Sequence, residues 1–135
     1  MVRVLVVENG ASPRDSLTSL FADHPFEVAA VPNIHIGLKY VREAWPDLVA
    51  IDLDVPVIEV FEFFRQLRSE PAIADTRVIF YTSVDEATAL SVAAPHGVKT
   101  ILPKPCDLNT AIAAINSELA ENSPPLAILG VNNEP

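Results

Sequence analysis

Residues 48–56 read Leu-Val-Ala-Ile-Asp-Leu-Asp-Val-Pro, and this stretch decides how the rest of the chain is interpreted. The apolar run 48–51 is typical of a buried strand, and it leads directly into Asp52 and then into a loop that contains Asp54. A strand of this kind carries a carboxylate to the edge of a sheet. The sequence therefore predicts an acidic site at the end of this strand.

Three other segments have the same design, in which an apolar strand runs straight into polar residues. Residues 4–7 precede Glu8 and Asn9, residues 78–81 precede Thr82 and Ser83, and residues 100–102 precede Pro103-Lys104-Pro105. If these strands are parallel, their carboxyl ends meet at one edge of the sheet, which is where open α/β sheets bind ligands. We therefore expect one site for a phosphoryl group or a cation, built from Glu8, Asn9, Asp52, Thr82 and Lys104.

Helical patterns alternate with these strands, and a short strand at 26–30 completes a (βα)5 unit. We expect a doubly wound α/β fold whose five parallel strands have the order 2-1-3-4-5, with the first and fifth helices on one face. The expected helices begin near Ser12, Asn33, Val57, Asp85 and Asp107, and the last ends near Glu121.

The helical period also predicts which side chains face the core. The expected inward residues are Ile34, Leu38, Val41 and Trp45 in the second helix, Val57, Phe61, Phe64 and Leu67 in the third, Leu90 and Ala94 in the fourth, and Leu108, Ala111, Ile112, Ile115 and Leu119 in the fifth. Trp45 and all phenylalanines of the third helix are expected to be buried.

Composition points to one soluble cytoplasmic domain. The chain has 135 residues, half of them hydrophobic, and a formal net charge of −9, which opposes binding to nucleic acid or to an anionic membrane. A protein partner with basic patches fits this charge better. Cys106 is the only cysteine, so the chain forms no internal disulfide, and with three scattered histidines it predicts no Cys/His metal cluster.

The four strand-end segments, in their order and spacing, resemble the receiver domain of bacterial response regulators. The resemblance covers about residues 3–121, so we expect a receiver domain over 1–121 and a tail or linker over 122–135. It implies the flavodoxin-like version of the doubly wound fold.

The resemblance also implies a signalling function in a two-component phosphorelay instead of a conventional enzyme. Asp52 would accept a phosphoryl group from a histidine kinase or phosphotransfer protein, and Thr82 and Lys104 would contact that group. The phosphorylated domain would then switch its binding to an output protein, and a homodimer stays open. The implied ligands of a Mg²⁺ ion are Glu8, Asn9, Asp52 and the backbone carbonyl of Asp54.

Two residues depart from the family pattern. Asn9 stands where the family normally has a second metal-binding carboxylate, and this loss of charge predicts weaker Mg²⁺ binding. The Asp54 side chain could restore part of the charge if it turns toward the site. Ile101 stands where the family usually has an aromatic residue that reports the arrival of the phosphoryl group, so output could use another surface.

These departures keep alternatives open. One is a degenerate receiver that binds its partner constitutively, without phosphate. Another is a haloacid-dehalogenase-like phosphatase, because residues 52–55 also resemble the nucleophile motif of those enzymes, although no later pair of acids supports it. For the tail, either loose packing or docking is open, and we predict that the apolar residues 126–131 contact an apolar surface.

Overall fold

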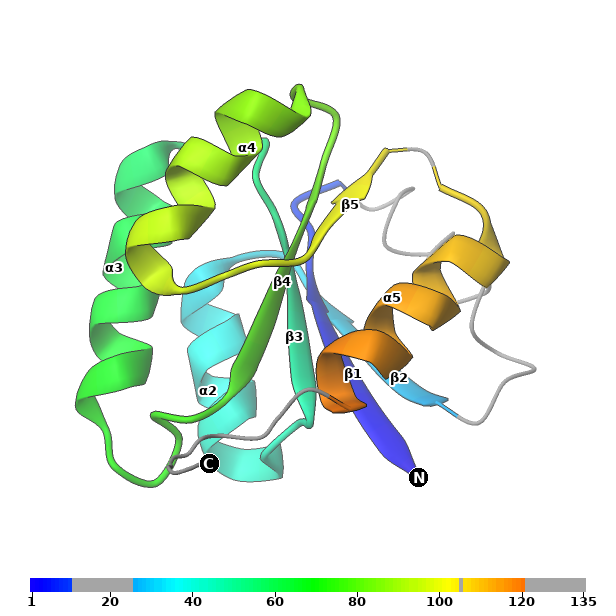
Figure 1. Cartoon of the computed structure of the whole chain (residues 1–135). Helices are drawn as coiled ribbons and strands as arrows, with labels where there is room; N and C mark the ends of the chain where they lie inside the picture. Colours follow the sequence, from blue (N-terminus) through cyan, green and yellow to red (C-terminus); the bar gives the residue numbers. More distant parts are fainter. Residues whose placement is uncertain (11–25, 105, 121–135) are drawn as a thin grey trace, which may run out of the picture.

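The computed structural model describes residues 1–10, 26–104 and 106–120. Its centre is one sheet of parallel strands in the order β2-β1-β3-β4-β5 (Figure 1). The strands are β1 (Val2–Val7), β2 (Phe26–Val31), β3 (Leu48–Asp52), β4 (Arg77–Thr82) and β5 (Ile101–Pro103). The predicted fold class and strand order are confirmed.

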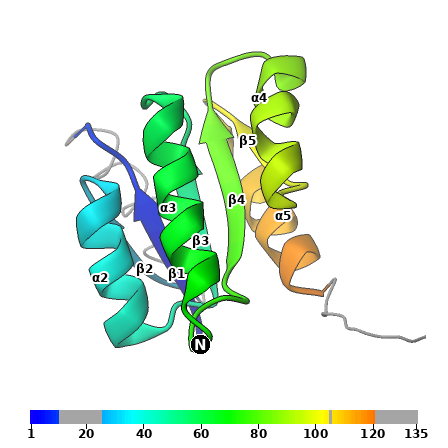
Figure 2. The same ribbon diagram turned by 90° about the vertical axis from the view of Figure 1, so that its left-hand side faces the viewer.

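Helices cover both faces of this sheet, as Figure 2 shows from the side. They are α2 (Ile34–Ala44), α3 (Val57–Ser69), α4 (Glu86–Ala93) followed by the short 3₁₀ helix η1 (Ala94–His96), and α5 (Leu108–Ala120). α2, α3 and α4 contribute to the core on one face and α5 to the core on the other, as predicted. The helix expected from Ser12 and the tail 122–135 lie outside the described residues.

Three helices begin next to residues that the sequence predicts, and in each the side chain of that residue is an N-cap. The side chains of Asn33, Asp85 and Asp107 accept hydrogen bonds from backbone amides three residues on, at 3.0, 2.9 and 2.8 Å. Such caps satisfy amides that have no partner inside the helix. They also fix where α4 and α5 leave the sheet edge.

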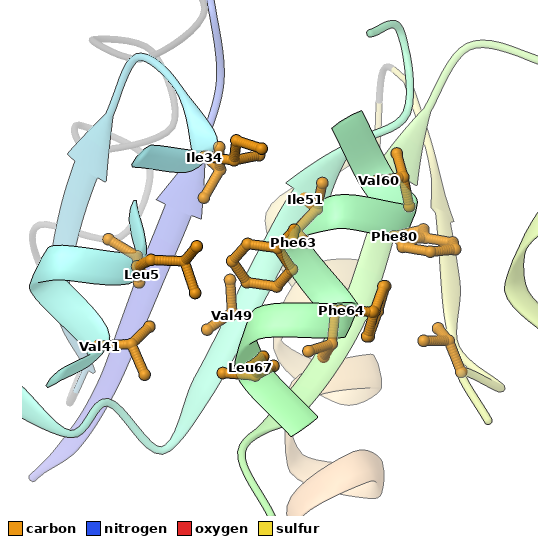
Figure 3. Close-up of a cluster of buried hydrophobic side chains, with 14 of the residues drawn as sticks. Leu5, Ile34, Val41, Val49, Ile51, Val60, Phe63, Phe64, Leu67 and Phe80 are labelled. Atoms are coloured by element: carbon orange, nitrogen blue, oxygen red, sulfur yellow. The ribbon is translucent and has the colours of Figure 1, made fainter. Parts of the chain in front are cut away.

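Alternation along the strands divides the core into two layers. In β3, Val49 and Ile51 pack toward α2 and α3, whereas Leu48 and Ala50 pack toward α5. Figure 3 displays the larger layer, in which Phe63 of α3 lies among the strand side chains. Both faces of β3 are apolar because both are covered.

Several predicted core positions are wrong. Trp45 is 65% exposed, because α2 ends at Ala44 and Trp45 takes the left-handed conformation (φ 48°) of a helix C-cap. In α3, Val57 and Phe61 are exposed, and Val60 and Phe63 face the core together with the predicted Phe64 and Leu67.

The buried face of α4 also differs from the prediction, by one residue along the chain. Ala89 and Ala93 are buried, whereas the predicted Leu90 and Ala94 are exposed. Small residues allow α4 to approach the sheet closely, and its weak amphipathic pattern explains the error. In the part of the chain that the structure describes, no helix is long and apolar enough to span a membrane.

Candidate functional site

The carboxyl edge of the sheet brings together side chains from three strand ends. Asp52 is the last residue of β3, and Glu8 directly follows β1; both are only 4% exposed. Thr82, the last residue of β4, is 1% exposed. Burial of two carboxylates next to each other is costly unless cations or hydrogen bonds compensate them.

Lys104 supplies that compensation. Its Nζ lies 2.8 Å from Asp52 Oδ1, 3.1 Å from Glu8 Oε1 and 3.3 Å from Asp54 Oδ2. The backbone places the lysine, because Lys104 N donates to the carbonyl of Thr82 at 2.8 Å just beyond β5. The lysine therefore bridges acids that are far apart in the sequence.

Two donors hold one oxygen of the Asp52 carboxylate. Oδ1 accepts from Lys104 Nζ and from the backbone amide of Asp54, the latter at 2.8 Å. Thr82 is held in a similar way, because its Oγ1 accepts from the amide of Val84 at 3.0 Å. The Asp52 carboxylate and the Thr82 hydroxyl thus have defined positions.

The charges of the site shift the ionisation of its groups. Burial raises the pKa of Asp52 above its ordinary value, against bonds from Lys104 and the Asp54 amide. Burial also acts to raise the pKa of Glu8, but its bonds with Asp52, the Gly10 amide and Lys104 lower it overall. Burial would lower the pKa of Lys104, yet Asp52 and Glu8 raise it, so the lysine is a permanent cation.

The site carries excess negative charge. Glu8, Asp52 and Asp54 are three carboxylates and Lys104 is one ammonium group, which gives −2 when all are ionised. Oxygen ligands and net negative charge suit a hard divalent cation. Among the described residues, however, no three His, Cys, Asp or Glu side chains gather closely enough to hold a metal by themselves. A cation here needs other oxygens as well, such as an amide or a backbone carbonyl.

The two residues that depart from the family pattern, Asn9 and Ile101, lie in different surroundings. Asn9 is exposed, unlike Glu8, although it does interact with other groups. Ile101 is partly buried, packs against the larger core layer and lines a hollow of about 260 Å³ with Thr82, Val84, Glu86 and Pro103. An aromatic side chain at position 101 is larger than isoleucine and would fill more of this hollow.

Sequence reasoning missed two neighbours of the site. Ser83 Oγ donates to Asp54 Oδ2 at 3.1 Å, and Lys104 Nζ lies 5.0 Å from the centre of the Tyr81 ring. The pairing of Asp52 with Tyr81 in the sheet brings that ring close. The direct signal for both was their place beside Thr82 at the end of β4.

Comparisons with known proteins give a consistent result. The family model described as "Response regulator receiver domain" matches residues 4–116. The chain is 29% identical over 120 residues to protein PilH of Pseudomonas aeruginosa, covering 89% of this chain and 99% of PilH. It is 26% identical to the DNA-binding response regulator MtrA of Mycobacterium tuberculosis, covering 89% of this chain but 51% of MtrA.

A solved structure supports the fold. The chemotaxis response regulator CheY4 of Vibrio cholerae superposes with a TM-score of 0.76 at 22% identity, covering 87% of this chain and 98% of that one. The chain thus spans the whole of PilH but about half the length of MtrA. These similarities favour a receiver over the phosphatase alternative, since the family match includes all four strand-end segments.

Proposed function

The chain belongs to the response regulator receiver domain family, and from that premise we propose that Asp52 accepts a phosphoryl group from a phosphorylated histidine of a partner protein. A receiver of this family acts in two-component signal transduction. The finer assignments, to individual residues, a metal and partners, are part of the proposal.

One observation carries the assignment of Asp52. It is the carboxylate at the end of the central strand β3 and pairs with the cation Lys104 at 2.8 Å, and the buried hydroxyl of Thr82 ends the adjacent strand β4. Phosphoryl transfer depends mainly on positioning and on neutralising charge. A lysine and a hydroxyl beside one oriented carboxylate supply both.

The proposed reaction has a simple balance. An oxygen of Asp52 attacks the phosphorus of the phosphohistidine, the P–N bond breaks, and the leaving imidazole takes up a proton. The acyl phosphate that forms has oxygens that accept hydrogen bonds from Lys104 Nζ and Thr82 Oγ1. Burial of Asp52 and Thr82 strengthens these interactions, because the local dielectric is lower than in water.

We include Mg²⁺ in the proposal, and the oxygen-rich donor set fits it. Glu8 and Asp52 would hold the ion together with Asn9 and the backbone carbonyl of Asp54. The ion would supply positive charge between two approaching anions. A neutral amide at position 9 contributes less attraction than a carboxylate, so we expect weak binding.

The proposed partners are a histidine kinase or phosphotransfer protein, which donates the group, and an output protein or domain. The acidic charge of −9 suits protein surfaces with basic patches more than nucleic acid or anionic membranes. In this proposal the chain is cytoplasmic, and its only catalysis is on itself, in gaining and losing the phosphoryl group. A homodimer is compatible with this function.

The test uses acetyl phosphate and Mg²⁺ as a small phosphoryl donor. We expect intact-protein mass spectrometry to detect a single phosphoryl group, and peptide mapping to locate it at Asp52. Asp52→Asn should abolish the modification, whereas the matched change at an exposed acid, Asp75→Asn, should not. Modification that persists in Asp52→Asn would refute the assignment.

A constitutive binding module is the second candidate, and one observation favours it. Thr82 and Lys104 already contact a carboxylate, that of Asp54, without any phosphoryl group. If neither the wild type nor a variant with a strengthened cation site can be modified, this candidate replaces the first.

A further inference from the structure

The side chain of Asp54 makes more contacts than a loop acid requires. Its Oδ1 accepts from Thr82 Oγ1 at 3.3 Å, and its Oδ2 accepts from Ser83 Oγ at 3.1 Å and from Lys104 Nζ at 3.3 Å. The donors come from the ends of β4 and β5, and the acid comes from the loop after β3. One carboxylate therefore joins three donors.

Two of these donors are needed elsewhere in the proposed function. Lys104 and Thr82 are the groups that would bind oxygens of a phosphoryl group on Asp52. Asp54 follows Asp52 by only two residues in the sequence, and its backbone amide donates a hydrogen bond to the Asp52 carboxylate. The Asp54 carboxylate therefore presents negative oxygens to the same donors that a phosphoryl group would use.

Other functions do not account for the position of the Asp54 side chain. It does not cap α3, whose N-cap is Pro56 and has no side-chain hydrogen bond. Its side chain is 36% exposed, so burial does not force it inward. Its bonds are long for charge-assisted bonds. The hydroxyl donors lie at 3.3 and 3.1 Å, against about 2.5–2.7 Å, and Lys104 Nζ lies at 3.3 Å, against about 2.7–2.9 Å, so these bonds can be exchanged for stronger ones.

We propose that Asp54 is an internal anion that holds Thr82 and Lys104 in the free protein and must be displaced when a phosphoryl group reaches Asp52. The competition part of this inference rests on the proposed function; the restraint of Thr82 does not. The carboxylate lowers the affinity of the site for an incoming anion, by repulsion and by occupying its donors. It also reduces the change that phosphorylation causes at Thr82, because the hydroxyl is already held.

The first experiment measures competition with beryllofluoride, a non-covalent analogue of the phosphoryl group, with Mg²⁺ kept at a saturating concentration for each variant. Binding is followed by the backbone amide signals of Thr82, Ser83 and Lys104 in NMR titrations of the full chain. Asp54→Asn keeps the shape of the side chain and removes its charge, and we expect it to bind about tenfold more tightly than the wild type.

The matched control is Glu86→Gln. Glu86 lines the same hollow as Thr82 and is exposed, and the change removes one negative charge without touching the Asp54 contacts. We expect less than a threefold effect. Equal gains in Asp54→Asn and Glu86→Gln would mean that only general charge matters, and an unchanged affinity in Asp54→Asn would overturn the competition while leaving the proposed function intact.

The second experiment needs no phosphoryl group or metal. Side-chain couplings of Thr82 report how its χ1 rotamers are populated. Asp54→Ala removes the bond to Asp54 and keeps the bond from the Val84 amide, and we expect one rotamer in the wild type and a larger share of other rotamers in the variant. If no variant binds beryllofluoride, the proposed function fails, and this measurement still decides whether Asp54 holds Thr82. A Thr82 side chain that is equally fixed in Asp54→Ala would overturn the inference.

Discussion

At the scale of single residues, the properties of the site depend on where each negative charge stands. Glu8 and Asp52 are buried carboxylates, Asn9 is an exposed amide, and Asp54 brings a third carboxylate from the loop. Asp54 offsets some of the charge that Asn9 lacks. Its position differs, however, because it contacts the donors Thr82 and Lys104 and occupies them.

Replacing Asn9 with aspartate tests the effect of charge on the cation site. We expect Asn9→Asp to bind Mg²⁺ about tenfold or more tightly, because a carboxylate attracts the ion more strongly than an amide. Without metal the added charge should lower the free energy of unfolding, since it repels Glu8 and Asp52. Calorimetric Mg²⁺ titration and urea unfolding measure the two effects.

The control for this variant is Asn116→Asp, the same change at an exposed position of α5. It should leave Mg²⁺ affinity unchanged. If Asn9→Asp binds Mg²⁺ no better than this control and accepts no phosphoryl group from acetyl phosphate, the constitutive module becomes the better description.

At the scale of elements, α3 illustrates how packing against neighbouring strands determines which face of a helix is buried. It has apolar residues on two overlapping stripes, one through Val57 and Phe61 and one through Val60 and Phe63. Contact with the β-strands buries the second stripe and leaves the first exposed. Phe61 still has a neighbour, because its ring meets His96 of η1 edge-on with 4.8 Å between ring centres.

Two alanine substitutions in this helix should therefore differ. Phe63→Ala removes a fully buried ring and should lower the free energy of unfolding by about 3–5 kcal/mol. Phe61→Ala is the same chemical change at a side chain that is 45% exposed, and it should cost about 1 kcal/mol. Urea unfolding of both variants gives the comparison, and equal losses would contradict the burial described here.

At the scale of the whole molecule, the site also contributes to the stability of the sheet edge. Lys104 joins carboxylates that follow β1, end β3 and lie in the next loop. Without the lysine, Glu8 and Asp52 would be buried side by side with no cation between them. Removing one partner of a buried ion pair costs more than the pair itself contributes.

We therefore expect Lys104→Met to lower the free energy of unfolding by about 2 kcal/mol or more at neutral pH. The loss should shrink as the pH falls from neutral towards the ordinary pKa of a carboxyl group, because burial without the lysine raises the pKa of Asp52 and Glu8 above that of the unfolded chain and the folded state takes up more protons. Urea unfolding across this range measures the trend. Lys39→Met, at an exposed site on α2, serves as the control and should show neither effect.

The sequence alone determined the topology and which strand ends share one edge of the sheet. Apolar strands that end in Glu8, Asp52, Thr82 and Lys104 alternate with helical patterns, and in a parallel sheet such ends share one edge whatever the details of packing. The strand order and the starting points of α2, α4 and α5 followed for the same reason, since both depend on local patterns and general rules of connection.

Only the tertiary structure decided which helix faces are buried and where the side chains of the site point. Adjacent helical positions such as Val60 and Phe61 or Ala89 and Leu90 differ by about a quarter of a turn, and packing against neighbouring elements buries the first of each pair and leaves the second exposed. The contacts of Asp54 with Thr82, Ser83 and Lys104 join loops about 30 to 50 residues apart in the chain. No local pattern encodes such contacts, because they exist only after the ends of β3, β4 and β5 have been brought together.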